Sequence, residues 1–250
     1  WFYSSPELRK ESQDFYEPRM SGKMVRLPGS WMQGFWINSN RAKKFSASIE
    51  LYHRIAPRYD AQGTELSWST NYRFNNKLSA GLSSYMEFFN KTLGFAYIEE
   101  PDVIMGLRDR RTADNVFNVK YNFNNKMGLT FRLRHYWSKV DYTRFFTLLD
   151  DGNVADLSVA SQNPNTNVNF FNIDMNYTWQ FAPGSFVNIT LKTASELFDQ
   201  YVREKYYYNL RSTIQSPQIS TFSIKVIYFL DYLDLKGNKS KRASNSPIPG

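Results

Sequence analysis

Strict alternation of apolar and polar residues over long stretches most constrains the fold of this chain. From Phe171 to Phe181, every odd position is apolar or aromatic and every even position is polar. This period of two is typical of a β-strand with one apolar face. A tilted strand needs about 9–11 residues to cross a bilayer, whereas strands in globular proteins usually run about 5–6. The pattern predicts an antiparallel transmembrane β-barrel, with a soluble β-sandwich as the alternative.

Other segments repeat the alternation and are joined in pairs by short turns. The alternating segments are Leu66–Phe74, Leu78–Phe88, Phe117–Phe123, Met127–Leu133 and Val187–Leu191. Asn and Gly dominate the short turns at 75–77, 124–126 and 182–185, as expected of hairpins. Longer, more polar connections are predicted at 4–28, 55–63, 90–112, 142–166 and 197–220. Outer-membrane barrels have short periplasmic turns and long external loops, so the short turns and the C-terminus are expected to be periplasmic.

The number of strands indicates how the chain is organised. The segments from Trp31 to Tyr232 provide nine strands, and Trp1–Tyr3 resembles the stub of a tenth. Residues 1–235 are therefore expected to form barrel strands and loops, with the barrel continuing upstream of residue 1. Residues 236–250 are basic and lack periodicity, which predicts a flexible tail.

Composition removes several classes of protein. Mean hydropathy is −0.55, and charged residues interrupt the longest apolar run, Ile224–Leu235, so no membrane-spanning helix is expected. The chain has no cysteine and only two histidines. We expect neither a metal site nor a cofactor, and a non-enzymatic protein.

Alternation also assigns side chains to the two faces of the barrel wall. Five apolar residues are expected to face lipid: Trp68, Phe131, Ile173, Met175 and Leu191. Aromatic residues beside the short turns predict an interfacial girdle, formed by Tyr72, Phe74, Tyr121, Phe123, Trp179 and Phe181. The opposite, lumen-facing set is charged: Glu50, Glu65, Arg73, Glu87, Lys120, Arg132, Arg134, Asp174, Lys192 and Lys225.

The charged lumen is open to two functional interpretations. It can line a pore that selects solutes, or its charges can pair in a filled lumen. The mixture of acids with arginines favours pairing, because selective pores more often display rings of one sign. The expected role is a scaffold or surface-binding component of an outer-membrane assembly, and the alternative is a solute channel.

Four other groups of residues suggest weaker hypotheses. His135 with Ser138 and Asp141, or His53 with Asp60, would suit a hydrolase at the barrel rim, although His135 shares the parity of the lipid-facing residues. Basic residues expected in loops or at strand ends can meet lipopolysaccharide phosphates or remain solvated: Arg108, Arg110, Arg111, Arg203, Lys205 and Arg211. No nucleic acid is expected. A turn explains Asp150–Asn153 better than a calcium site does.

Several segments resemble a known family. These are Phe15–Arg19, Gly34–Asn40, Asp102–Arg108, Asn124–Val140 and Phe222–Leu233. They resemble the C-terminal region of a Bacteroidota outer-membrane family whose members carry an N-terminal domain resembling family-nine carbohydrate-binding modules. The resemblance implies an outer-membrane β-barrel with long loops at the cell surface. The partners expected of such a protein are outer-membrane lipid, lipopolysaccharide and other outer-membrane or periplasmic proteins. It implies carbohydrate binding only through upstream domains, and it assigns no catalytic residue.

Overall fold

The structure is a computed structural model that describes residues 1–201 and 205–230. The main sheet contains β1 (Phe2–Arg9), β4 (Ser30–Asn38), β5 (Phe45–Ala56), β6 (Ala61–Arg73), β7 (Leu78–Glu99), β8 (Asp102–Asn124), β9 (Met127–Leu148), β10 (Val154–Leu157), β11 (Thr166–Ala182), β12 (Ser185–Asp199) and β13 (Gln218–Ile227). A small second sheet pairs β2 (Ser12–Asp14) with β3 (Val25–Leu27). The helical elements are the 3₁₀ turn η1 (Arg58–Asp60) and helix α1 (Tyr206–Gln215). The predicted all-β antiparallel architecture is confirmed.

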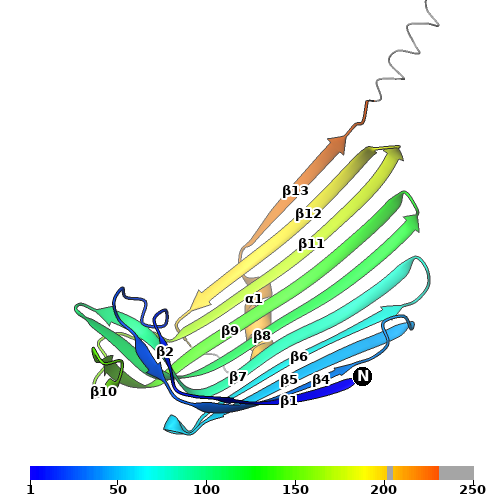
Figure 1. The fold of residues 1–250 in the computed structure, drawn as a ribbon. Coiled ribbons are helices and arrows are strands. Elements are labelled where there is room, and N and C mark those ends of the chain that lie inside the picture. Colours follow the sequence, from blue (N-terminus) through cyan, green and yellow to red (C-terminus); the bar gives the residue numbers. More distant parts are fainter. Residues whose placement is uncertain (202–204, 231–250) are drawn as a thin grey trace, which may run out of the picture.

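The main sheet is a meander whose neighbours follow chain order. Its path is β1-β4-β5-β6-β7-β8-β9-β11-β12-β13, with β10 added beside β9. Figure 1 shows the sheet curving into a trough, with β1 and β13 at its two edges. Over the described residues the sheet is an open curved wall that does not close into a barrel. No helix in the described part of the chain is long and apolar enough to span a membrane.

The short turns lie where the sequence places them. Asn75 Oδ1 accepts hydrogen bonds from the backbone N–H groups of Lys77 and Leu78, both at 2.8 Å. Asn124 Oδ1 accepts one from Lys126 in the same way. Gly184 has a φ of +72° in the turn before β12, a conformation that glycine adopts without strain. Local turn chemistry therefore fixes all three hairpins.

The opposite ends of the strands differ from the prediction. Residues 55–63 and 90–112 were expected to be long loops, but β5 continues to Ala56, β6 begins at Ala61, and β7 and β8 run on to a tight turn after Glu99. The register shifts between Phe89 and Thr92, between Phe95 and Tyr97, and between Leu107 and Arg108. In β7 each bulge changes which parity faces inward. In β8 the residues from Val103 to Leu107 are all buried, on both faces. Alternation is therefore lost while both strands continue.

Two further segments are also more ordered than predicted. The loop expected at 142–166 contains the end of β9 and all of β10, and the one expected at 197–220 contains α1. The expected stub at Trp1–Tyr3 is the start of the eight-residue strand β1, which pairs with β4 along its whole length. Residues 231–235 and the predicted tail at 236–250 lie outside the described residues.

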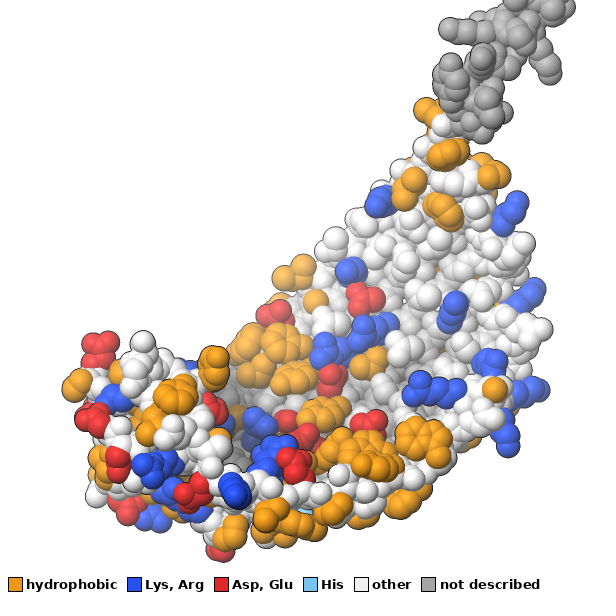
Figure 2. Space-filling model, in the orientation of Figure 1, with side chains coloured by type: hydrophobic (Ala, Val, Ile, Leu, Met, Phe, Trp, Pro, Cys, Tyr) orange, Lys and Arg blue, Asp and Glu red, His pale blue; other side chains and the backbone are white. Residues whose placement is uncertain are grey.

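The hydrophobic core lies at the end of the wall away from the short turns. There the β2–β3 hairpin places Val25 against Met105, Leu107 and Phe146, and all four are nearly or fully buried. Figure 2 shows this N-terminal part built up beside the hollow face of the wall. Elsewhere the described residues form a single layer of strands, so within them no second sheet covers the face opposite the hollow.

Candidate functional site

The register divides the wall into two chemically different faces. Even-numbered residues of β8, β9, β11 and β12 line a hollow, and we call this side the inner face. Odd-numbered residues of these strands form the outer face, on which α1 packs through His135, Asn167 and Asn169. In Figure 1, α1 lies behind the sheet, on the side away from the hollow face seen in Figure 2.

The residues expected to face lipid share the outer face. Met175 lies directly opposite Phe131 on β9 and Leu191 on β12. Ile173 lies opposite Leu133, and Trp68 lies opposite Ile49. The structure thus places these apolar side chains in cross-strand contact range, and none of the five is buried.

The residues of the expected aromatic girdle meet beside the short turns. Ring centroids of Tyr72 and Phe74 lie 4.7 Å apart, and those of Tyr121 and Phe123 lie 4.7 Å apart. The Trp179 and Phe181 rings follow at 5.8 Å. Aromatic pairs therefore form at the turn-side end of three strands.

Several of the charged residues meet in a hollow of about 820 Å³ on the inner face. Asp174 lies opposite Arg132 on β9 and Lys192 on β12. Lys120 and Lys225 complete the charged lining, so four cations face one acid in this hollow. It can accommodate an anionic or strongly hydrated solute.

Nearer the hydrophobic core, ion pairs neutralise the inner face. Arg134 donates from Nε and Nη2 to the two oxygens of Asp114, at 2.8 and 2.7 Å. Arg110 pairs with Glu87 at 3.3 Å. The sequence pattern did not assign Asp114 to a face and placed Arg110 in a loop, because residues 90–112 were not expected to continue the strands.

Two acids on the inner face share one donor. Glu65 and Glu87 lie opposite each other on β6 and β7. The hydroxyl of Tyr85 lies 2.8 Å from Glu87 Oε1 and 3.2 Å from Glu65 Oε2. The arrangement lets one phenol proton serve two facing carboxylates.

Two of the predicted charged residues lie away from these pairs. Arg73 donates to backbone carbonyls of Ala42 and Lys43, the latter at 2.9 Å, and so holds the turn between β4 and β5. Glu50 lies opposite Trp36 and Ser67, in the middle of the wall.

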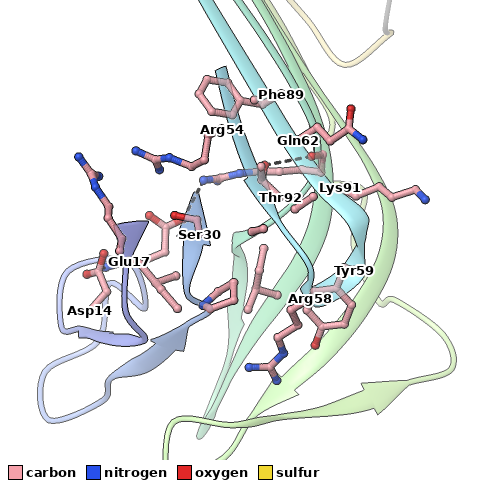
Figure 3. Close-up of a pocket in the computed structure, with 18 of the residues that line it drawn as sticks. Asp14, Glu17, Ser30, Arg54, Arg58, Tyr59, Gln62, Phe89, Lys91 and Thr92 are labelled. Carbon is pink, nitrogen blue, oxygen red and sulfur yellow. Dashed lines mark hydrogen bonds and ion pairs between the residues drawn. The ribbon is translucent and has the colours of Figure 1, made fainter. Parts of the chain in front are cut away.

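A second hollow, of about 400 Å³, lies between the N-terminal hairpin and the inner faces of β5 to β8 (Figure 3). Glu17 Oε1 accepts hydrogen bonds from Arg108 Nη2 at 2.9 Å and from the Phe95 backbone N–H at 2.8 Å. These contacts fasten residues far apart in sequence. The Phe89 ring packs over Gly63, where any Cβ would overlap it.

This second hollow carries a surplus of positive charge. The cations lining it are Arg9, Lys10, Arg54, Arg58, Lys91, Arg108 and Arg110, against Asp14, Glu17 and Glu65. The guanidinium of Arg110 also stacks 4.7 Å from the Phe89 ring centroid. Planar guanidinium groups bind carboxylates and phosphates well, so the hollow is a candidate anion site.

The two histidines make no contacts of the hydrolase type. His135 Nδ1 lies 2.7 Å from the Tyr206 hydroxyl, and His135 is only 1% exposed beneath α1. Ser138 bonds to Thr112 instead. His53 Nδ1 contacts Thr64. The outward parity of His135 is as predicted, but its expected lipid exposure is wrong because a helix covers it. Over the described residues, no three His, Asp or Glu side chains cluster as metal ligands.

The basic residues expected in loops or at strand ends occupy ordered elements. Arg108, Arg110 and Arg111 belong to β8, and Arg211 belongs to α1, with Lys205 at its N-cap. Arg203 lies outside the described residues.

The segment at 150–153 forms a turn that supports β3. Arg26 donates from its backbone N–H to the Gly152 carbonyl and from Nε to the Asp151 carbonyl, both at 2.9 Å. The pKa of the Asp151 carboxyl is lowered mainly by a hydrogen bond from the backbone N–H of Asn153, and to a smaller extent by one from the Asn153 side-chain amide.

The comparisons with known proteins give a family and no activity. A family model described as Domain of unknown function (DUF5916) matches residues 2–239. No curated protein matches the chain.

Proposed function

We propose that this chain, which belongs to the DUF5916 family, forms part of an outer-membrane β-barrel wall and acts as a non-enzymatic scaffold and surface-binding component. The observation that best supports this proposal is the apolar outer face of β11 between Trp179, at its turn-side end, and α1. Ile173 and Met175 lie on this stretch and neither is buried, whereas Phe171, nearer α1, is only 7% exposed. In the part of the chain that the structure describes, no second sheet covers Ile173 and Met175. An uncovered apolar face of this kind is favourable against lipid and costly in water.

The length of this apolar stretch matches a bilayer. Trp179, in the girdle, and Asn169, under α1, are ten positions apart in β11. At about 3.3 Å per residue they are about 33 Å apart along the strand. With a tilt of about 40° the height is about 25 Å, which is the height of the apolar band in outer-membrane barrels.

In this proposal the short turns are periplasmic and the core end of the wall lies outside the cell. The cationic hollow under the β2–β3 hairpin then opens toward the exterior, where lipopolysaccharide or another anionic surface component can reach it. Carbohydrate binding through upstream domains is a further part of the proposal that rests on the family resemblance alone. The C-terminus is then periplasmic.

Single-cysteine labelling tests the orientation without interference, because the chain has no native cysteine. Asn153→Cys should react with a membrane-impermeant maleimide on intact cells. Asn125→Cys should react only after the outer membrane is permeabilised. Labelling of residue 125 on intact cells would reverse the orientation, and equal labelling of both residues in a soluble fraction would exclude the membrane location.

The second candidate function is a solute channel. It is favoured by the 820 Å³ hollow, in which four cations face Asp174 alone. The ion pairs on the inner face nearer the hydrophobic core, Arg134 with Asp114 and Arg110 with Glu87, favour a closed passage. We expect the full-length protein to show little conductance in a planar bilayer. Stable, large conductance steps that change when Arg132 is replaced by Gln would establish the channel instead.

A further inference from the structure

Helix α1 has an inverted distribution of polar and apolar residues. Asn209 and Thr213, one turn apart, are fully buried against the outer face of the wall. Asn209 Oδ1 accepts hydrogen bonds from Asn167 and Asn169, at 3.0 and 3.4 Å. Ser195 donates to the carbonyl of Thr213 at 2.6 Å. The face that a helix in a soluble protein makes apolar is here polar.

The opposite face of α1 is aromatic, apolar and basic. Tyr207, Tyr208 and Ile214 are 65%, 53% and 43% exposed. Arg211 is exposed and follows the two tyrosines by about one turn, so it lies on their side of the helix. The ammonium group of Lys205 lies 5.9 Å from the Tyr208 ring. Aromatic rings beside long cationic side chains are typical of a membrane–water interface.

The position of α1 fits the same environment. It covers β9, β11 and β12 where outer-face parity places His135, Asn167 and Asn169, three polar residues. This zone lies about 25 Å in height from the aromatic girdle at the short turns, as worked out above. Polar groups of the wall directed at lipid would be costly without partners, and the helix supplies one hydrogen-bond partner to each of these three side chains.

We infer that α1 is an interfacial anchor that lies in the headgroup layer of the outer leaflet, where Arg211 and Lys205 bind lipid phosphates and Tyr207, Tyr208 and Ile214 enter the acyl boundary. This inference rests on the proposed membrane location of the wall. It adds a lipid-binding site that a membrane location of the β-barrel wall does not by itself require. The ligand is the phosphate of an outer-leaflet lipid.

Depth-dependent quenching tests the position of the helix. Single cysteines at Ile214, Met175 and Val159 of the full-length protein are labelled with an environment-sensitive fluorophore in phosphatidylcholine–phosphatidylglycerol vesicles. The label at 214 should be quenched best by lipids carrying a nitroxide near the headgroup. The label at 175 should be quenched best by a nitroxide deep in the acyl chain. Val159, which is 79% exposed, provides the unquenched reference.

The outcomes separate this inference from the proposed function. If residue 175 is quenched from the deep position and residue 214 is not quenched at all, the wall is in the membrane but the anchor is wrong. If neither residue is quenched, the membrane location fails and the anchor fails with it.

Charge reversal tests phosphate binding. Arg211→Glu should speed amide hydrogen exchange of the helix at 206–216 several-fold in the same vesicles, whereas Arg211→Lys should stay close to the parent. In maltoside micelles, which contain no phosphate, the Glu variant should match the parent. An equal acceleration in micelles would show that Arg211 only supports the fold of the helix, and no acceleration in vesicles would exclude phosphate binding.

Discussion

Placing arginine at Ile173 tests which face of the wall meets lipid. Ile173 lies six positions from Trp179 and four from Asn169 in β11. With about 3.3 Å per residue and a tilt of about 40°, these separations correspond to heights of about 15 and 10 Å. In the proposed membrane orientation the side chain therefore lies within about 3 Å of the centre of the apolar band. Arginine at that depth costs about 2–4 kcal/mol in outer-membrane barrels.

The matched control introduces the same charge on the inner face of the same strand. Asn176 lines the larger hollow and accepts one hydrogen bond from Thr190, at 3.1 Å. Arginine there reaches open space, so Asn176→Arg should lower the free energy of unfolding by no more than about 1 kcal/mol.

The assay is reversible urea unfolding of the full-length protein in short-chain phosphatidylcholine vesicles, followed by tryptophan fluorescence. Ile173→Arg should lower the free energy of unfolding by about 2–4 kcal/mol. Equal losses at residues 173 and 176 would refute the assignment of faces. A larger loss at 176 would mean that the register is shifted by one residue.

Three further tests examine packing and pairing in the structure. Gly63→Ala places a Cβ inside the ring packed over it, and should destabilise the protein by about 1–3 kcal/mol in the same assay; no loss would mean that the ring is free to move. Tyr206→Phe leaves two partners of its hydroxyl, the buried His135 and the half-buried Asn115, without that hydrogen bond and should cost about 1–3 kcal/mol. The exposed Tyr207→Phe should cost about 0.5 kcal/mol or less, and similar values for the two variants would contradict these hydrogen bonds. A double-mutant cycle of Asp114→Ala and Arg134→Ala should give a coupling of about 1 kcal/mol, because the pair is bidentate but partly exposed, and a coupling of zero would contradict the pair.

Local sequence signals were sufficient for the strands beside the short turns. Because side chains alternate strictly along a strand, the pattern from Phe171 to Phe181 already separates the two faces of β11. The hairpin at Asn124 is equally local, since its side chain bonds to the backbone two residues ahead. Cross-strand neighbours such as Met175 and Phe131 follow once the turn fixes the register.

The charged hollows could be predicted only in part. Asp174, Arg132 and Lys192 were assigned to one face from parity, and the register places them side by side. Asp114 was not assigned to a face and Arg110 was placed in a loop, because bulges in β7 and burial of both faces of β8 from Val103 to Leu107 interrupt the alternation there. A bulge is set by how two strands pair and has no signature within a single strand.

What the sequence by itself determined was the antiparallel wall and its two faces, because period-two patterning and Asn or Gly turns act over a few residues. Tertiary structure decided the rest. Helix α1 forms where a polar loop was expected, because its buried Asn209 finds hydrogen-bond partners about forty positions away, on β11. The N-terminal hairpin is positioned by Glu17 and Arg108, which are 91 positions apart. Contacts at such separations depend on the curvature of the assembled sheet, which no short stretch of sequence encodes.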